Sequence, residues 1–125
     1  MEVSSSVYLE NIIAKSNQAG IIYSITSRFD LHSSNFHNNS LANNQAIIVI
    51  AYSAKLPQIT IKNTNIFENQ IKENGIIIDY SIVAMNNLSL FDNHYQNNSV
   101  GTLIYESFLS ITNSNFYQLK FKYYF

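Results

Sequence analysis

The feature that most constrains the fold of this chain is a short phrase that recurs along its whole length. The phrase reads apolar-x-apolar, then Asn or Asp within a few residues, then an aromatic or aliphatic residue. Its first apolar residue serves as a register mark. The marks are Val7, Phe29, Ile59, Leu88 and Leu109, in steps of 22, 30, 29 and 21 residues. A period of this size is typical of stacked supersecondary units.

A second apolar run follows each phrase and is introduced by a small residue. The small residues are Gly20, Ala46, Gly75 and Gly101, which include all three glycines of the chain. Both runs are rich in β-branched and aromatic residues, and the first alternates with period 2, so each unit predicts two β-strands. No unit has the i, i+3, i+4, i+7 spacing of a helix. The polar stretch between the runs varies in length, as expected of loops that bulge from a stack.

These strands predict an all-β fold, a right-handed parallel β-helix (solenoid) of about five coils, lightly capped, in one domain over residues 1–125. A leucine-rich repeat is the alternative architecture, although its Asn falls at a different spacing. In a parallel β-helix, equivalent residues lie above one another. The expected inward rows are Phe29, Ile59, Leu88 and Leu109; Leu31, Ile61, Leu90 and Ile111; and Phe36, Ile66, Tyr95 and Phe116. Asn39, Asn69 and Asn98 are expected to stack at a bend, where Asn tolerates left-handed backbone angles and its amide can bond to both neighbouring coils.

The phrase, for example Leu109-Ser110-Ile111-Thr112-Asn113-Ser114-Asn115-Phe116, resembles the repeats of the pectate-lyase-like superfamily of right-handed parallel β-helices. The excess of Asn, Ile and Tyr is similar to that of β-helical surface proteins of ciliate protists. The resemblance covers residues 7 to 118. It implies either a polysaccharide lyase, hydrolase or esterase, or a non-catalytic adhesin or scaffold, and it favours an extracellular or cell-surface location.

Composition narrows the function classes. The formal net charge is −1 and only 12% of residues are charged, so the basic stripe of a nucleic-acid-binding protein is absent. Without Cys, the chain has neither a disulfide framework nor a zinc-thiolate site. No apolar run approaches the roughly 20 residues of a membrane-spanning helix. Residues 1–6 lack the basic region and the apolar region that begin a secretory signal. The sequence does not identify the compartment.

The catalytic templates of the superfamily are not matched. The only aspartates are Asp30, Asp79 and Asp92, and the only arginine is Arg28. Asp79 and Asp92 lie in different parts of one coil, so the paired carboxylates of glycoside hydrolysis are not expected. The three histidines, His32, His37 and His94, have no partner at metal-ligand spacing and are expected at exposed loops or strand edges. The sequence therefore predicts no catalytic, cofactor-binding or metal-ligating residues, and no cofactor.

Two further groups of residues stand out in the pattern. A recurring set of tyrosines is expected near one corner: Tyr23, Tyr52, Tyr80 and Tyr105. We favour a place in the core for them, and the alternative is an outward aromatic ridge suited to contact with a sugar or a protein. Three N-x-S sequons begin at Asn38, Asn87 and Asn97, and they matter only in a secreted protein.

The expected function is a non-enzymatic structural or interaction module that contacts a protein or a glycan. The alternative is a carbohydrate-active enzyme or polysaccharide-binding β-helix, for which a cleft joining Asp79, Asp92, Glu106 or Arg28 would be the sign. Expected partners are a protein or a second copy that associates through the coil ends, with no nucleic acid. We also expect the chain to be a segment of a longer solenoid or to have an end that associates, because an uncapped stack exposes unpaired strand edges.

Overall fold

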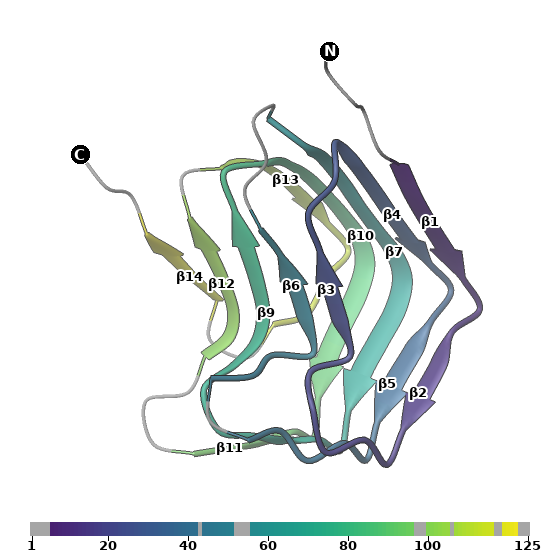
Figure 1. The fold of residues 1–125 in the computed structure, drawn as a ribbon, viewed down its shortest axis with the longest axis vertical. Coiled ribbons are helices and arrows are strands. Elements are labelled where there is room, and N and C mark those ends of the chain that lie inside the picture. The colour runs from purple at the N-terminus through teal and green to yellow at the C-terminus, as the bar shows by residue number, and fades with distance from the viewer. Residues whose placement is uncertain are drawn as a thin grey trace.

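A computed structural model describes residues 6–42, 44–51, 56–96, 100–105, 107–116 and 119–122, the last of these by their backbone only. Within these residues every regular element is a β-strand, and all the strand pairs are parallel (Figure 1). The chain is a parallel β-solenoid of about four turns, which confirms the all-β parallel β-helix predicted from the repeat. Tyr52, Asn97, Asn98 and Glu106 lie outside the described residues.

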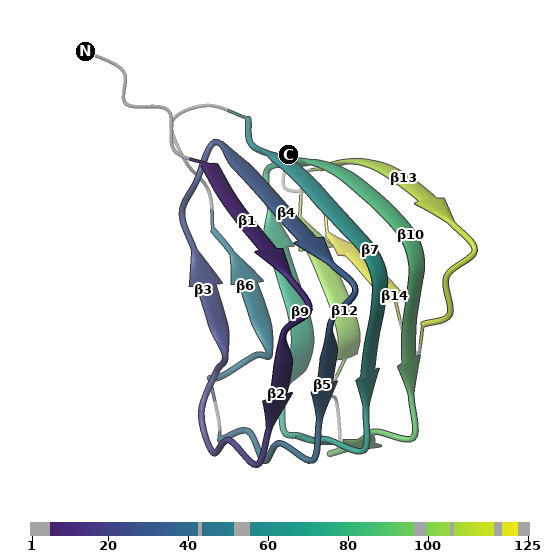
Figure 2. The same ribbon diagram turned by 90° about the vertical axis from the view of Figure 1, so that its right-hand side faces the viewer.

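The first sheet forms one wall of the solenoid and contains one rung from each coil (Figure 2). Its strands, in spatial order, are β1 (Ser6–Glu10), β4 (Arg28–His32), β7 (Gln58–Phe67), β10 (Ile82–Phe91) and β13 (Phe108–Thr112). The wall bends part-way along each coil. In the first two coils the bend separates β1 from β2 (Ile13–Lys15) and β4 from β5 (Asn35–His37), whereas β7 and β10 run through it. Five rungs span four turns of the chain.

The second sheet faces the first across the core (Figure 1). Its order is β14 (Leu119–Lys122), β12 (Val100–Tyr105), β9 (Asn74–Asp79), β6 (Ile48–Ile50) and β3 (Ile22–Ser24). A short third side joins the walls, where β8 (Gln70–Ile71) pairs with β11 (His94–Tyr95). The closed outline buries the apolar side chains that point inward from both walls.

The register of the fourth rung differs from the one expected. Val83, not Leu88, lies opposite Ile59, and Met85, not Leu90, lies opposite Ile61. Leu88 instead faces Thr64, and Leu90 continues the row of Phe36 and Ile66 in the place expected for Tyr95. The steps between equivalent residues are therefore 22, 30, 24 and 26 residues. The expected steps of 29 and 21 were wrong because the fourth rung carries two apolar-x-apolar pairs.

The core consists of these corrected rows. One inward row is Val7, Phe29, Ile59, Val83 and Leu109, and the next is Leu9, Leu31, Ile61, Met85 and Ile111. In the three middle rungs these side chains are at most 1% exposed. From the second sheet, Ile48, Ile50, Ile76 and Ile78 meet them, each 0% exposed. Burial of this kind contributes about 1.5–3 kcal/mol per large aliphatic side chain.

Each bend of the wall is made by a column of residues in the left-handed backbone region. The first column is Asn11, Ser33, Asn63, Asn87 and Asn113, with φ between 49° and 56°. The second is Ser16, Asn38, Glu68 and Asp92, with φ between 52° and 59°. Asn populates this region more readily than other non-glycine residues, which explains why the repeat is rich in Asn. The left-handed residues precede the expected stacking asparagines rather than coinciding with them.

A buried column of asparagines follows the second bend. Asn39 donates its backbone N–H and its side-chain amide to Oδ1 of Asn69, at 2.9 Å each, and Asn69 bonds to Asn93 in the same way at 3.0 and 2.9 Å. Asn17 bonds likewise to Asn39. The predicted Asn39–Asn69 stack is thus confirmed, but Asn93 takes the position expected for Asn98, and Asn17 was missed. We call Asn17, Asn39, Asn69 and Asn93 the asparagine ladder.

The asparagine ladder provides hydrogen-bond partners both for its own side-chain amides and for backbone groups at the bend. The side-chain amides of Asn39, Asn69 and Asn93 also donate to carbonyl oxygens of the preceding coil, on Ala14, Phe36 and Ile66, at 2.9–3.1 Å. Asn39 and Asn69 are each 1% exposed. Buried amides are stable only when all their donors and acceptors are paired. This pairing makes the asparagines structural parts of the wall.

Hydroxyl groups perform a similar task at the other bends. Ser34, Thr64 and Ser114 each donate to the carbonyl two residues back, and the oxygens of Ser34 and Ser114 accept the backbone N–H of Ile12 and Leu88 from the preceding coil. Ser81 and Ser107 repeat this arrangement at the return from the second sheet. Side-chain bonds of this kind stabilise turns that the sheet ladder leaves unpaired.

Candidate interaction surface

The outward rows of the first sheet form a mostly polar wall. Three rows run across its five rungs: Ser6, Arg28, Gln58, Ile82 and Phe108; Tyr8, Asp30, Thr60, Ala84 and Ser110; Glu10, His32, Lys62, Asn86 and Thr112. Apolar residues enter at the fourth and fifth rungs, where Ile82 and Phe108 of the first row are 43% and 70% exposed and Ala84 of the second row is exposed. The wall therefore presents repeated short polar side chains rather than a concave site.

Titratable side chains gather at the N-terminal end of this wall, where they form what we call the charged cluster: Tyr8, Glu10, Arg28, Asp30, His32 and Lys62. Arg28 Nε lies 2.7 Å from Asp30 Oδ2. Desolvation, a hydrogen bond with Glu10 and the charges of Glu10 and Asp30 raise the pKa of Tyr8 above its ordinary value of 10.0. The phenol is therefore protonated at neutral pH, and the cluster holds two acidic residues, two basic residues, a histidine and a neutral tyrosine.

Pairing between coils gives His32 charged neighbours that are far from it in the sequence. Parallel pairing places Glu10 on one side of His32 and Lys62 on the other. The His32 ring lies edge-on to Tyr8, with centroids 5.3 Å apart, and its Nε2 is buried without a hydrogen-bond partner among the described residues. His32 and His37 are half-buried in strands, so the expectation of exposed histidines was wrong for both; His94 is exposed on β11.

The carboxylates singled out from the sequence are not brought together. Asp79 ends β9 and Asp92 follows β10, so the ten residues of β10 separate them. Arg28 lies on β4 and is paired with Asp30 rather than with either of them. Among the described residues, no group of three His, Asp or Glu side chains could hold a metal ion. The acid–base neighbours in this structure are Glu10, Asp30 and His32. Glu10 meets His32 only through pairing between coils, whereas Asp30 lies two residues before His32 on β4 and was overlooked in the sequence analysis.

Past the first bend, the outward face carries a stack of rings. His37 and Phe67 have centroids 4.9 Å apart with planes 5° from parallel, and Phe67 and Phe91 have centroids 5.0 Å apart with planes 2° from parallel. These spacings follow the strand separation of about 4.8 Å. Phe67 has a ring on each face, whereas His37 and Phe91 are each covered by a ring on one face. A sugar that binds an aromatic residue packs on a ring face, so Phe67 at the centre of the stack is not available to a sugar.

The outward face of the second sheet carries an apolar row across four of its strands. The row consists of Tyr23, Val49, Ile77 and Leu103, and we call it the apolar row; the adjoining outward row contains Asp79 beside Tyr105. Tyr23 is 70% exposed, and the other three are half-buried. Single exposed apolar residues are normal on protein surfaces, but a contiguous row marks a contact surface. The apolar row is the feature that most distinguishes the second wall from the polar first wall.

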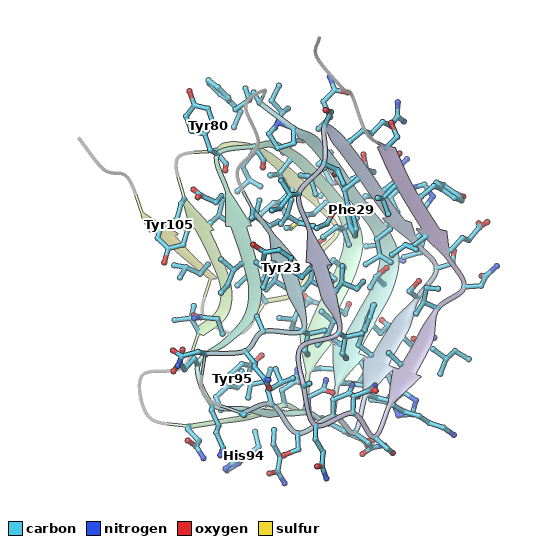
Figure 3. The ribbon with its side chains drawn as sticks, viewed as in Figure 1. Tyr23, Phe29, Tyr80, His94, Tyr95 and Tyr105 are labelled. Atoms are coloured by element: carbon cyan, nitrogen blue, oxygen red, sulfur yellow. The ribbon has the colours of Figure 1, made fainter. Side chains whose placement is uncertain are left out.

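The tyrosines do not form the buried corner that was expected. Tyr23 and Tyr80 are exposed and Tyr105 is half-buried, and they occupy three different register positions. Figure 3 shows Tyr80 at the upper corner, with Tyr23 and Tyr105 on the second sheet and His94 at the opposite end. The expectation of core tyrosines was therefore wrong for Tyr23 and Tyr80, and Tyr52 lies outside the described residues.

The bends offer one small hollow and two exposed sequon asparagines. Asn38, Asn39, Ser40, Glu68 and Gln70 line an open hollow of about 130 Å³, whereas ligand pockets usually measure roughly 300–1,000 Å³. Asn38 and Asn87 are exposed in the two left-handed columns, and the third sequon lies outside the described residues. The described part of the chain includes no helix that is long and apolar enough to cross a membrane.

Comparison with known proteins adds no identity to this geometry. The sequence matches no protein-family model, and it has no match among curated proteins or solved structures. The resemblance to β-helical proteins therefore holds at the level of the parallel β-solenoid architecture.

Proposed function

We propose that this chain is a non-enzymatic structural and interaction module, a rigid solenoid whose outer walls contact a protein partner. The observation that carries the proposal is the contrast between its two walls. The first wall is mostly polar, whereas the second presents Tyr23, Val49, Ile77 and Leu103 as an unbroken apolar row. A row of this kind on a rigid sheet suits the apolar centre of a protein–protein interface.

The use of the polar residues inside the wall also supports a structural role. The asparagine ladder and the serine and threonine hydroxyls form hydrogen bonds between coils, so the residues that dominate the repeat build the scaffold. In the aromatic stack both faces of Phe67 are covered by rings, which favours a protein over a glycan as the partner. Family membership in the pectate-lyase-like superfamily and a cell-surface setting belong to the same proposal and rest on the resemblance of the repeat.

A charge placed in the middle of the apolar row tests the interaction role. The purified chain is immobilised, proteins that bind it from the native extract are identified, and binding is compared with that of Ile77→Lys. Thr60→Lys, a half-buried outward residue on the first wall, is the matched control. We expect the same partner on the wild type and on Thr60→Lys and its loss on Ile77→Lys. Equal recovery on both variants would contradict the role of the second wall.

The carbohydrate-active alternative is tested at the charged cluster, because that is where acid and base groups converge. Acidic and neutral polysaccharides are screened for turnover, with and without calcium. The proposal predicts no turnover. Reproducible cleavage that is lost in both Glu10→Gln and His32→Ala, but kept in Asp92→Asn, would replace the structural role by an enzymatic one.

A further inference from the structure

At the first and last rungs, the described residues cover the core only in part. In the first rung, Val7, Leu9 and Ile12 are only partly buried, although they occupy inward rows. Leu109, Ile111 and Phe116 are in the same condition at the other end. Their equivalents in the middle rungs, such as Phe29, Leu31 and Ile59, are at most 1% exposed. One more coil on either end would bury these side chains as fully as those of the middle rungs.

The strand edges at the two ends are also open. Among the described residues, β1 pairs only with β4 and β2 only with β5, and β13 pairs only with β10. At the first rung the asparagine ladder ends on Asn17. The Oδ1 atoms of Asn39, Asn69 and Asn93 each accept two hydrogen bonds from the ladder residue before them, whereas Oδ1 of Asn17 accepts none from the described residues. Unpaired donors and acceptors of this kind are templates for another strand.

The open edges of β1 and β13 have complementary patterns of backbone donors and acceptors. The N–H of Asn11 donates to His32 O, and N–H groups alternate sides along a strand, so the N–H of Tyr8 points to the open edge of β1. The N–H of Phe108 donates to Ser81 O, so the backbone of Leu109 points to the open edge of β13. When Val7 of one copy is set opposite Leu109 of another, the N–H of Tyr8 meets the carbonyl of Leu109, and the inward rows continue without a break.

We infer that the chain binds a second copy of itself head to tail, with β1 of one copy pairing in parallel with β13 of the next. This inference rests on the proposed structural role and names a partner for the coil ends. A head-to-head pair related by a two-fold axis would lay each coil on a reversed coil, so the bends would not coincide. The head-to-tail contact is heterologous, because it joins two different surfaces, and it therefore leads to open linear assemblies.

The test compares the 125-residue chain with a variant that blocks one edge. Tyr8→Pro removes an N–H that points away from β4, so it should prevent edge pairing and leave the internal sheet intact. Tyr8→Ala removes the same aromatic side chain and keeps the N–H, which makes it the matched control. Sedimentation velocity over a range of concentrations and electron microscopy follow assembly. We expect linear particles that grow with concentration for the wild type and Tyr8→Ala, and their loss for Tyr8→Pro.

A second experiment, in which Tyr8→Pro is mixed with the wild type, keeps the test decisive even if Tyr8→Pro is less stable than the wild type. Its tail end is unchanged, so the variant should add to the head of a wild-type copy and stop growth there. Small amounts of it should then shorten wild-type assemblies, whereas the same amount of Tyr8→Ala should not. A wild-type chain that stays monomeric at all concentrations, or assemblies that Tyr8→Pro neither joins nor shortens, would overturn the head-to-tail contact. Binding of a protein partner to the apolar row is measured separately, so either idea can fail without the other.

Discussion

The side-chain oxygen of Asn69 accepts two hydrogen bonds from Asn39 in the coil before it, one from the backbone N–H and one from the side-chain amide, each at 2.9 Å. Asn69 in turn donates to Phe36 O and to Asn93 Oδ1. One side chain therefore joins three successive coils at a position that is 1% exposed. The stability of the whole stack depends on such contacts, because each coil alone has too small a core.

Removal of the Asn69 amide should be among the most damaging single changes on the polar side of the wall. Asn69→Ala removes the acceptor of the Asn39 backbone N–H and of one N–H of the Asn39 side-chain amide, and it removes a donor to the carbonyl of Phe36. Each buried donor left unpaired costs about 1–3 kcal/mol, so we expect a loss of about 2–6 kcal/mol in the free energy of unfolding. Urea denaturation measures this loss. Asn65→Ala, which removes one half-buried bond to Asn35, should cost less than about 1 kcal/mol and serves as the control.

The left-handed column at the first bend predicts a sharp side-chain preference. Ser33 has a φ of 51° and is exposed, so its side chain is free to change while the backbone is not. Ser33→Val should destabilise the protein by about 1–2 kcal/mol, because a β-branched residue is strained at this backbone angle. Ser33→Asn should cause no loss, since Asn occupies the other four positions of the column. Thermal unfolding that ranks Val equal to Asn would contradict the strain.

Gly75 is required for space rather than for a positive φ. A Cβ atom added there would lie 2.6 Å from the carbonyl oxygen of Gly101 in the next coil, and neither backbone can move without disturbing the sheet. We expect Gly75→Ala to cost about 1–3 kcal/mol, the range for overpacked sites. Gly20→Ala would approach Ala46 O at 2.9 Å, but Gly20 is exposed in the first coil, where the chain can shift, so its cost should be clearly smaller. Equal costs in chemical denaturation would contradict this account.

Thr102 occupies a buried position at which we expect valine to be more stable than the natural threonine. It is 0% exposed in an otherwise apolar row with Ile48 and Ile76, and its hydroxyl has no hydrogen-bond partner among the described residues. Thr102→Val keeps the shape and removes the unpaired hydroxyl, so we expect a gain of about 1 kcal/mol. Thr60→Val, on the outer wall, should change stability by less than about 0.5 kcal/mol. A loss of stability in Thr102→Val would show that the hydroxyl is paired in solution.

The sequence predicted the architecture well because the repeat states the same pattern in each coil. Phe29, Ile59 and Leu109 were placed in one inward row, and Asn39 and Asn69 in one ladder, as the structure has them. The fourth rung defeated the same reasoning. Its phrase contains Val83-x-Met85 as well as Leu88-x-Leu90, and the second pair, followed by Asp92 and Asn93, imitates the start of a repeat.

Surface properties were less predictable than the rows. Whether Tyr23 points inward depends on the parity of its strand position, and a shift by one residue reverses it. The charged cluster was missed because Glu10, His32 and Lys62 are neighbours only through parallel pairing between coils. The expected marks Val7, Phe29 and Ile59 already aligned these three residues, each three positions later, but only the inward rows were read from that alignment.

The most direct test of the account is a cross-link that reports the register of the fourth rung. The chain has no cysteine, so two introduced thiols report on each other alone. Thr60 and Ala84 are paired neighbours on the outer wall, and the strand spacing of about 4.8 Å falls within the disulfide range of Cα separations, about 4.4–6.8 Å. We predict that Thr60→Cys/Ala84→Cys forms an intramolecular disulfide in the folded protein and that Thr60→Cys/Ser89→Cys does not. A disulfide in the second pair and none in the first would contradict the register, and with it the asparagine ladder and both walls built on it.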